Sequence, residues 1–227
     1  MKQFFCTLSI LIAINTFAQK KILDHPDFDI WNRIQNPVIG AEGNYVMYSL
    51  QQGEKDSHLK IKDRQGHLIL NYERSEDGQF TYDAKFAVFK IKAWTDSITE
   101  MKRRKEKKEK LPKDSIGIYN LEKQSLQKIA NVKSYKIPEK WSGFIAYTYD
   151  DSNDKTQTKS KNLKDTTKTK SNKKLKKTSS KNGYPLVIRN LKTSQEDTMR
   201  FVTNYTFAKK AKTLAYSTTG LKGKIKA

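Results

Sequence analysis

The sequence contains a single cysteine, Cys6, among its 227 residues. Cys6 falls within residues 1–18, a segment that we predict to be removed from the mature chain. A chain without thiols can form neither disulfides nor thiolate-bound metal centres. The mature protein is therefore neither a disulfide-stapled scaffold nor a zinc protein of the cysteine type.

Histidine is also scarce, with His25, His58 and His67 the only three in the chain. Serine hydrolase chemistry needs a nucleophile on a strained turn, a base and an orienting acid. The sequence contains no Gly-x-Ser-x-Gly turn, and no histidine has a nucleophile nearby along the chain. We therefore expect no catalytic residue in this sequence.

The patterns that hold metal ions and phosphate groups are missing as well. There is no paired-histidine motif and no Asp-x-Asp-x-Asp-Gly loop. The acidic cluster at 150–154 could hold a weak cation, but we interpret it as a solvated loop. We interpret Gly40–Gly43 as a turn, because it does not match a glycine-rich phosphate loop. We expect no metal site and no cofactor.

The apolar run Phe4–Ala13 is too short to cross a bilayer as a helix. It follows Lys2 and precedes the small residues Thr16 and Ala18, an arrangement typical of a secretory signal peptide. We therefore predict a signal peptide at 1–18 and a secreted or periplasmic protein. No membrane span is expected after cleavage.

Acidic residues are few: 24 Asp and Glu stand against 45 Lys and Arg, for a formal net charge of +21. Residues 101–113 carry a net +6 and residues 155–181 a net +10, so most of the excess lies in two short segments. These segments lack the interleaved aromatic residues that stack on bases. The charge distribution argues against a nucleic-acid partner and favours a solubilising role, with anion binding through 155–181 as an alternative.

A regular internal spacing is present. Three isoleucines are each followed by an aromatic residue after 28, 29 and 28 residues, and each lies in a short alternating run. The pairs are Ile61 with Phe89, Ile118 with Tyr147, and Ile188 with Tyr216. The shortest full period, from Tyr48 to Phe89, is 41 residues, the length of one four-stranded β-propeller blade. The sequence therefore predicts an all-β partial propeller of about three blades and the start of another.

The first unit contains clear strand and turn signals. Strands are expected over Tyr45–Leu50, from His58, over Leu68–Tyr72 and up to Phe89. Turns are expected at 42–44, at 65–67 and at Asp77–Gly78. Before them, Phe28, Trp31 and Ile34 recur every three residues and predict a short helix over Asp24–Gln35, with Trp31 packed as a core residue.

These signals divide the chain into a leader with a short helix at 19–37 and an incomplete propeller at 38–227. The propeller has charged insertions at 101–113 and 152–182, which we place in one equivalent connection between blades. The first is predicted to be a helix over Met101–Leu111 that ends at Pro112. The second is predicted to be disordered, because its Lys, Ser and Thr residues bury too little apolar surface.

Five stretches resemble secreted bacterial serine peptidases of the prolyl oligopeptidase family. They are Asp24–Trp31, Asn44–Tyr48, Phe86–Lys92, Leu111–Ser115 and Leu214–Ser217. The resemblance implies an N-terminal propeller that packs on an α/β-hydrolase domain and restricts entry to small peptides. The catalytic Ser, Asp and His of that family would lie in the hydrolase domain, and no residue of this chain matches them.

Propeller rings usually close with four to eight blades. The next isoleucine-type anchor would fall near position 229, so we expect the chain to be a non-catalytic N-terminal fragment of such a peptidase. Its expected partners are the hydrolase domain and peptide substrates. A stand-alone envelope propeller that binds or scaffolds other proteins is the alternative, and a basic anion-binding protein is a third.

Overall fold

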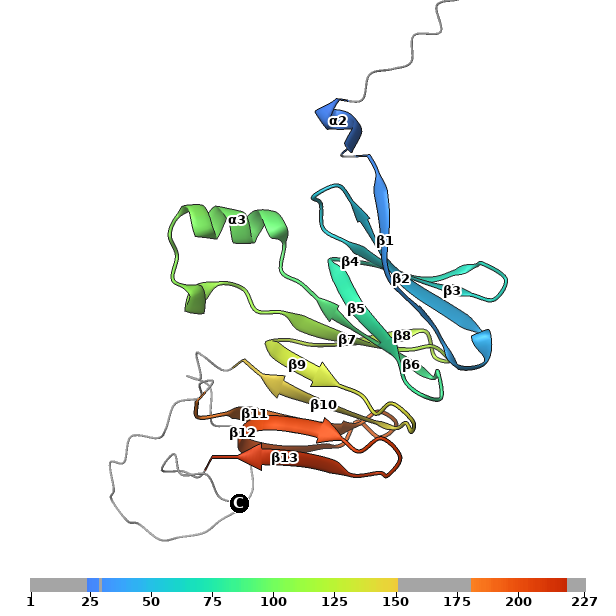
Figure 1. Cartoon of the computed structure of the whole chain (residues 1–227), viewed down its shortest axis with the longest axis vertical. Coiled ribbons are helices and arrows are strands. Elements are labelled where there is room, and N and C mark those ends of the chain that lie inside the picture. The colour runs from blue at the N-terminus through green and yellow to red at the C-terminus, as the bar shows by residue number, and fades with distance from the viewer. Residues whose placement is uncertain (1–23, 29, 151–180, 220–227) are drawn as a thin grey trace, which may run out of the picture.

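The computed structural model describes residues 24–28, 30–150 and 181–219. The predicted signal peptide and nearly all of the predicted disordered insertion lie outside these residues. Within them the chain is mostly β, with three antiparallel sheets that follow one another along the sequence (Figure 1). None of the described helices is long and apolar enough to cross a membrane.

The first two sheets are four-stranded meanders, in which neighbours in sequence are neighbours in the sheet. Blade 1 contains β1 (Asn32–Ile39), β2 (Tyr45–Gln52), β3 (His58–Asp63) and β4 (Leu68–Glu73). Blade 2 contains β5 (Ser75–Phe80), β6 (Phe86–Ile91), β7 (Ser115–Asn120) and β8 (Ser125–Ile129). These sheets match the predicted four-strand repeat unit.

The third sheet contains β9 (Val132–Lys136), β10 (Phe144–Tyr149), β11 (Tyr184–Asn190), β12 (Glu196–Phe207) and β13 (Leu214–Thr218). The first part of the long strand β12 pairs mainly with β11, and the part from Val202 onward pairs with β13. We therefore assign β9, β10, β11 and residues 196–200 to blade 3. Residues 202–207 and β13 are the start of blade 4.

The same backbone corner joins the successive blades. Arg74, Asn131 and Phe201 each stand directly before the first strand of the next blade, with φ of 57°, 59° and 59°. Their carbonyl oxygens accept hydrogen bonds of 2.8, 2.7 and 2.9 Å from the amides of Lys92, Asp150 and Thr219, respectively. A left-handed φ is uncommon outside glycine. Its occurrence at three equivalent positions shows that the corner geometry recurs from blade to blade.

The insertions lie within blades, which corrects the prediction that they join one blade to the next. In blades 2 and 3 the long connection runs from the second strand to the third, from β6 to β7 and from β10 to β11. The corners between blades stay short because each turns on a single left-handed residue. Sequence spacing located the insertions at equivalent points but did not show which two strands they separate.

The helix of the first insertion is α3 (Thr95–Arg103), which begins six residues before the predicted start at Met101. Asp56 caps its first turn by accepting hydrogen bonds from the backbone and hydroxyl of Thr95. Lys105 adopts φ 56°, and the amides of Lys105 and Glu106 bond back to the last turn, as in a Schellman motif. Residues 108–110 form only a 3₁₀ turn.

The predicted helix over Asp24–Gln35 is wrong in its second half. Helix α2 covers only His25–Phe28, and β1 begins at Asn32. Pro37 cannot donate to a ladder, and Asn36 has φ 48°, so β1 carries a bulge at this point yet pairs with β2 on both sides of it. Trp31 contacts the ring of Phe28 at 5.2 Å but remains 53% exposed, which contradicts its predicted core position.

Asp77–Gly78 is a bulge inside β5 and not the predicted turn. Asp77 has φ 52°, and the register shifts between Glu76 and Gln79. A Cβ atom at Gly78 would lie 2.6 Å from the Sδ atom of Met47. The glycine thus allows β5 to pass close to the side chains of blade 1.

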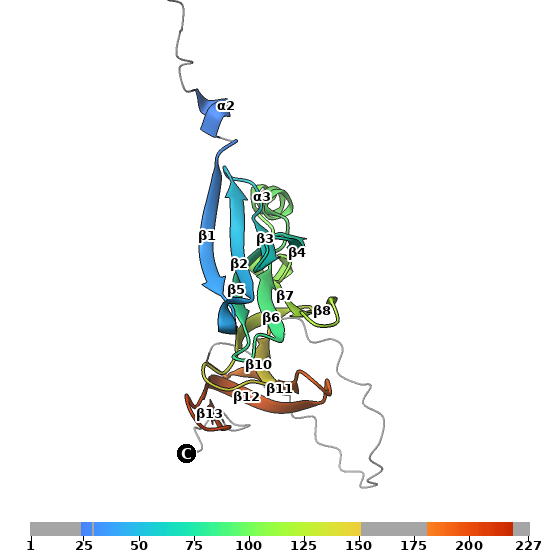
Figure 2. The ribbon, with the colours of Figure 1, turned by 90° about the vertical axis from the view of Figure 1, so that its right-hand side faces the viewer.

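The hydrophobic core consists of layers between blades. Along β6, Ala87 and Phe89 face blade 1, whereas Phe86 and Val88 face blade 3, so this strand is buried on both sides. Figure 2 shows the sheets following one another from β1 to β13. Of the repeat anchors, Ile61, Phe89, Ile118 and Tyr147 are buried. This layered order of four-stranded sheets is that of a partial β-propeller, as predicted.

Candidate functional site

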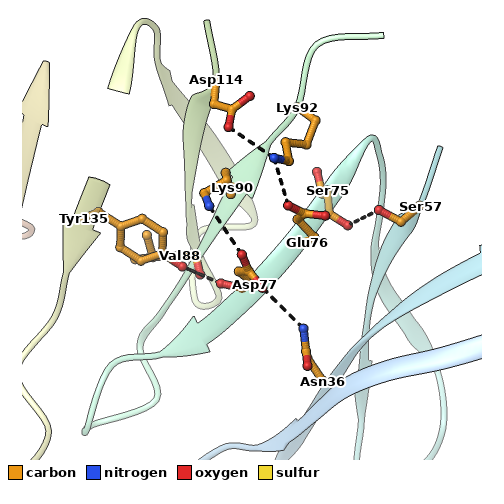
Figure 3. Close-up of polar contacts among 10 residues, drawn as sticks. All are labelled: Asn36, Ser57, Ser75, Glu76, Asp77, Val88, Lys90, Lys92, Asp114 and Tyr135. Atoms are coloured by element: carbon orange, nitrogen blue, oxygen red, sulfur yellow. Dashed lines mark hydrogen bonds and ion pairs between the residues drawn. The ribbon is translucent and has the colours of Figure 1, made fainter. Parts of the chain in front are cut away.

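The first strands of blades 1 to 3 carry polar groups that meet around Asp77 (Figure 3). The carboxylate of Asp77 accepts hydrogen bonds from Nδ2 of Asn36 at 3.3 Å and from Nζ of Lys90 at 3.4 Å. Its backbone carbonyl accepts a hydrogen bond from the hydroxyl of Tyr135, which also lies 3.4 Å from the carbonyl oxygen of Val88. One residue thus joins three blades.

The contact made by Tyr135 is repeated one blade further along. Tyr135 is the fourth residue of β9 and reaches Asp77, the third residue of β5. Tyr205 is the fourth residue of the first strand of blade 4, and its hydroxyl lies 3.0 Å from Oγ of Ser134, the third residue of β9. The first strands of blades 3 and 4 are therefore each tied by a tyrosine to the first strand of the blade before.

A second polar group lies at the base of the α3 insertion. Nζ of Lys92 is 3.2 Å from the carboxylate of Glu76 and 3.4 Å from that of Asp114. Partial burial acts to lower the pKa of Lys92, but attraction to Asp114 and Glu76 outweighs it and raises the pKa. Arg74 donates to the carbonyl of Lys92 at 2.9 Å and lies over the ring of Trp94 at 4.4 Å. These contacts hold the insertion against the corner between blades 1 and 2.

Burial raises the pKa of Tyr135 above the ordinary value of 10.0, and the nearby Asp77 adds to the effect. The phenol of Tyr135 ionises more easily in the unfolded chain than in the folded one. The contribution of the neutral phenol to the free energy of unfolding is therefore complete below about pH 10 and is lost as the pH rises further. We expect Tyr135→Phe to lower the free energy of unfolding by about 1 kcal/mol at pH 8, through the lost hydrogen bond. The free energy of unfolding should also fall less between pH 8 and pH 11 in this variant than in the wild type.

Urea unfolding of the wild type and of Tyr135→Phe at the two pH values measures both effects. Tyr82 is 57% exposed, so Tyr82→Phe is the control and should behave as the wild type. An unchanged difference between pH 8 and pH 11 in Tyr135→Phe would show that the buried phenol does not set the alkaline limit.

The structure does not bring the three histidines together into a site. His67 lies in the turn after β3, where its Nδ1 atom is 2.9 Å from the carboxylate of Asp63. His58 begins β3, and His25 lies in α2. Among the described residues, no group of three or more His, Cys, Asp or Glu side chains could hold a metal ion.

The acidic cluster and the glycine-containing turn considered in the sequence analysis can also be located in the structure. Asp150 forms an ion pair of 3.1 Å with Lys113, and the rest of the acidic cluster lies outside the described residues. Gly40–Gly43 is the turn between β1 and β2, where the amide of Gly40 donates to the carbonyl of Tyr45 at 2.8 Å. This turn contains the short 3₁₀ segment Ala41–Gly43.

Sequence reasoning missed the group around Asp77, because Asp-Gly was interpreted as a turn. Tyrosines follow the corner residues Asn131 and Phe201 by the same four positions, but the sequence alone does not reveal the corners. Only the structure shows that Asp77 and Tyr135 lie on neighbouring first strands.

No protein-family model and no curated protein matches the chain. Among solved structures, it is similar to the β-propeller domain of the Trilobed protease from Pyrococcus furiosus, described as having an open velcro topology. That match has 14% identity and a TM-score of 0.43, and covers 78% of this chain and 46% of that one.

Two further solved structures are similar to the chain at low identity. Acylaminoacyl peptidase from Pyrococcus horikoshii matches with 12% identity, a TM-score of 0.46 and coverage of 86% of this chain and 29% of that one. TolB from Acinetobacter baumannii matches with 8% identity, a TM-score of 0.40 and coverage of 84% and 42%. The chain therefore spans less than half the length of each of these three proteins.

Proposed function

We propose that this chain is the non-catalytic propeller part of a secreted serine peptidase of the prolyl oligopeptidase type. In the complete protein the propeller packs on an α/β-hydrolase domain and limits access to peptides. The catalytic residues belong to that other domain, and the blades described above surround the route by which substrates reach it.

The observation that carries the proposal is the open face of blade 1. The structure aligns Phe89 with Leu50, and not with Tyr48 as the sequence spacing predicts. Leu50 precedes Gly53 by three residues, as Phe89 precedes Lys92, and the amides of Gly53 and Lys92 donate to the carbonyls just before β1 and β5. Phe89 is completely buried against blade 1, whereas Leu50 is only partly buried and its strand partner Ile34 is 61% exposed. Blade 1 thus presents a face of the kind that receives another blade, which supports membership of a larger ring.

The kind of ring is suggested by the sequence resemblance. The matching stretches include Asn44–Tyr48 and Phe86–Lys92, which overlap β2 and β6, the second strands of blades 1 and 2. The polar side chains of the first strands around Asp77 are also compatible with a passage for peptides, because an apolar surface would retain them. A scaffold propeller would require the same blades but no hydrolase domain.

The test is to express the product of the complete coding region and treat it with a fluorophosphonate, which labels activated serines covalently. We expect labelling, cleavage of short peptide substrates and no cleavage of folded proteins. Asp77→Asn combined with Tyr135→Phe should loosen the contact between first strands and admit longer peptides. Absence of labelling, with only further 41-residue units downstream, would favour the scaffold alternative.

Secretion is a separate part of the proposal and has its own test. If residues 1–18 are a signal peptide, the mature protein begins at Gln19. N-terminal sequencing of the protein recovered from the producing cells measures this directly. A mature chain that starts at Met1 would rule out cleavage.

A further inference from the structure

A cavity of about 530 Å³ lies where three turns of blades 1 and 2 meet. The turn between β1 and β2 contributes Glu42, the first residue of β2 contributes Tyr45, and the turn between β5 and β6 contributes Tyr82, Asp83 and Lys85. The turn between β7 and β8 contributes Glu122 to the same cavity. Its volume is within the range of about 300–1,000 Å³ that is usual for ligand sites.

The middle turn of this cavity is held firmly. The carboxylate of Asp83 accepts hydrogen bonds from the hydroxyls of Thr81 at 2.7 Å and Ser142 at 2.8 Å, and from the amide of Lys85 at 3.3 Å. Partial burial acts to raise the pKa of Asp83, but these hydrogen bonds outweigh it and lower the pKa. Asp83 is therefore a fixed negative charge in the wall.

The cavity is negative in a strongly positive protein. Glu42, Asp83 and Glu122 contribute three carboxylates and Lys85 one ammonium group, a net charge of −2 in a chain of +21. Lys85 is already paired with Glu122 at 2.9 Å. Glu42 forms no ion pair with another described residue, so its carboxylate is available to a ligand.

Two phenol rings line the same space, which distinguishes it from a bare group of surface carboxylates. Tyr82 is 57% exposed, and Tyr45 is partly buried, with its ring 6.4 Å from that of Phe80. Rings of this type pack against aliphatic chains and attract cations to their faces. Carboxylates beside aromatic rings match a positive head group on an aliphatic stem.

We propose that this cavity binds the cationic side chain of a peptide, a lysine or an arginine. The carboxylates of Glu42 and Glu122 attract the positive group, and the ring of Tyr82 packs against the stem. The ligand is defined by charge complementarity, because an anionic ligand would meet a net negative wall. The proposal goes beyond the peptidase role proposed above and does not depend on it.

The test titrates the full chain with acetyl-Ala-Lys-Ala-amide at low ionic strength and monitors binding by two-dimensional NMR. The isosteric control peptide carries norleucine in place of lysine. We expect the lysine peptide to bind at least fivefold more tightly and to shift the resonances of the three turns. Equal binding of the norleucine peptide, or no binding of the lysine peptide, would overturn the proposal.

Variants locate the site. Glu42→Gln and Glu122→Gln should each weaken binding of the lysine peptide about threefold, and together about tenfold, as expected for partly exposed charge pairs. Tyr82→Ala changes an exposed side chain and should also weaken binding of the lysine peptide. Glu73→Gln, an equal charge change on the exposed end of β4, is the matched control. Unchanged binding in the double variant, or an equal loss in Glu73→Gln, would refute the site.

Discussion

Replacing Gly183 with alanine is expected to lower the free energy of unfolding by roughly 4 kcal/mol. Gly183 has φ +87°, a conformation that alanine adopts only with strain. An added Cβ atom would also lie 2.4 Å from the backbone carbon of Phe201 and 2.8 Å from the amide nitrogen of Val202. These atoms form the corner between blades 3 and 4, so they cannot move aside as a flexible side chain would.

Gly66→Ala is the matched control for this substitution. Gly66 has φ +90°, nearly the same as Gly183, but no atom lies within 4 Å of the position its Cβ would take. Gly66→Ala should therefore cost only the backbone strain, about 1–2 kcal/mol. Urea unfolding of both variants separates strain from steric overlap. Equal losses in the two variants would show that the corner is not tightly packed around Gly183.

The second large effect is expected for Phe89→Ala, which should lower the free energy of unfolding by about 3–5 kcal/mol. The ring of Phe89 is completely buried between blades 1 and 2, and it lies 5.6 Å from the ring of Tyr72. It also rests directly on Gly117, where an added Cβ would come within 2.6 Å of the ring. Removing it leaves a cavity that the backbone cannot fill.

Tyr216 occupies the equivalent position in β13, three residues before the amide that bonds to the corner carbonyl. Unlike Phe89, however, Tyr216 is 46% exposed. Tyr216→Ala should therefore cost less than about 1 kcal/mol. Phe89 and Tyr216 thus occupy the same position of the repeat in different environments. A similar loss for both would mean that Tyr216 is covered in solution.

The repeat was predictable from the sequence because strands buried on both faces require apolar residues at fixed spacing. Phe89 and Tyr147 stood out for that reason. The corners were not predictable, because Arg74, Asn131 and Phe201 share no chemistry. Their left-handed conformation follows from the position of the next blade and not from residue type, so tertiary structure decides it.

The prediction of a helix in the N-terminal segment was wrong for a related reason. Phe28, Trp31 and Ile34 have helical spacing, but β1 pairs with β2 on both sides of its bulge, which outweighs the local preference. The cavity bounded by Glu42, Tyr82 and Glu122 could not have been predicted either, because its walls are three turns far apart in the chain. Only the stacking of blades 1 and 2 brings them together.

The corner hydrogen bonds hold both ends of the α3 insertion in place. The α3 insertion starts at Lys92, whose amide is bound to the corner at Arg74, and it ends at Asp114, whose carbonyl accepts a 2.9 Å hydrogen bond from Val132 beside the next corner. Both ends are held by hydrogen bonds to the corners and not by the loop itself, and a longer loop adds only a slowly growing closure entropy. The connections between the second and third strands of blades 2 and 3 are therefore positions where other segments could be inserted without changing how the blades pack.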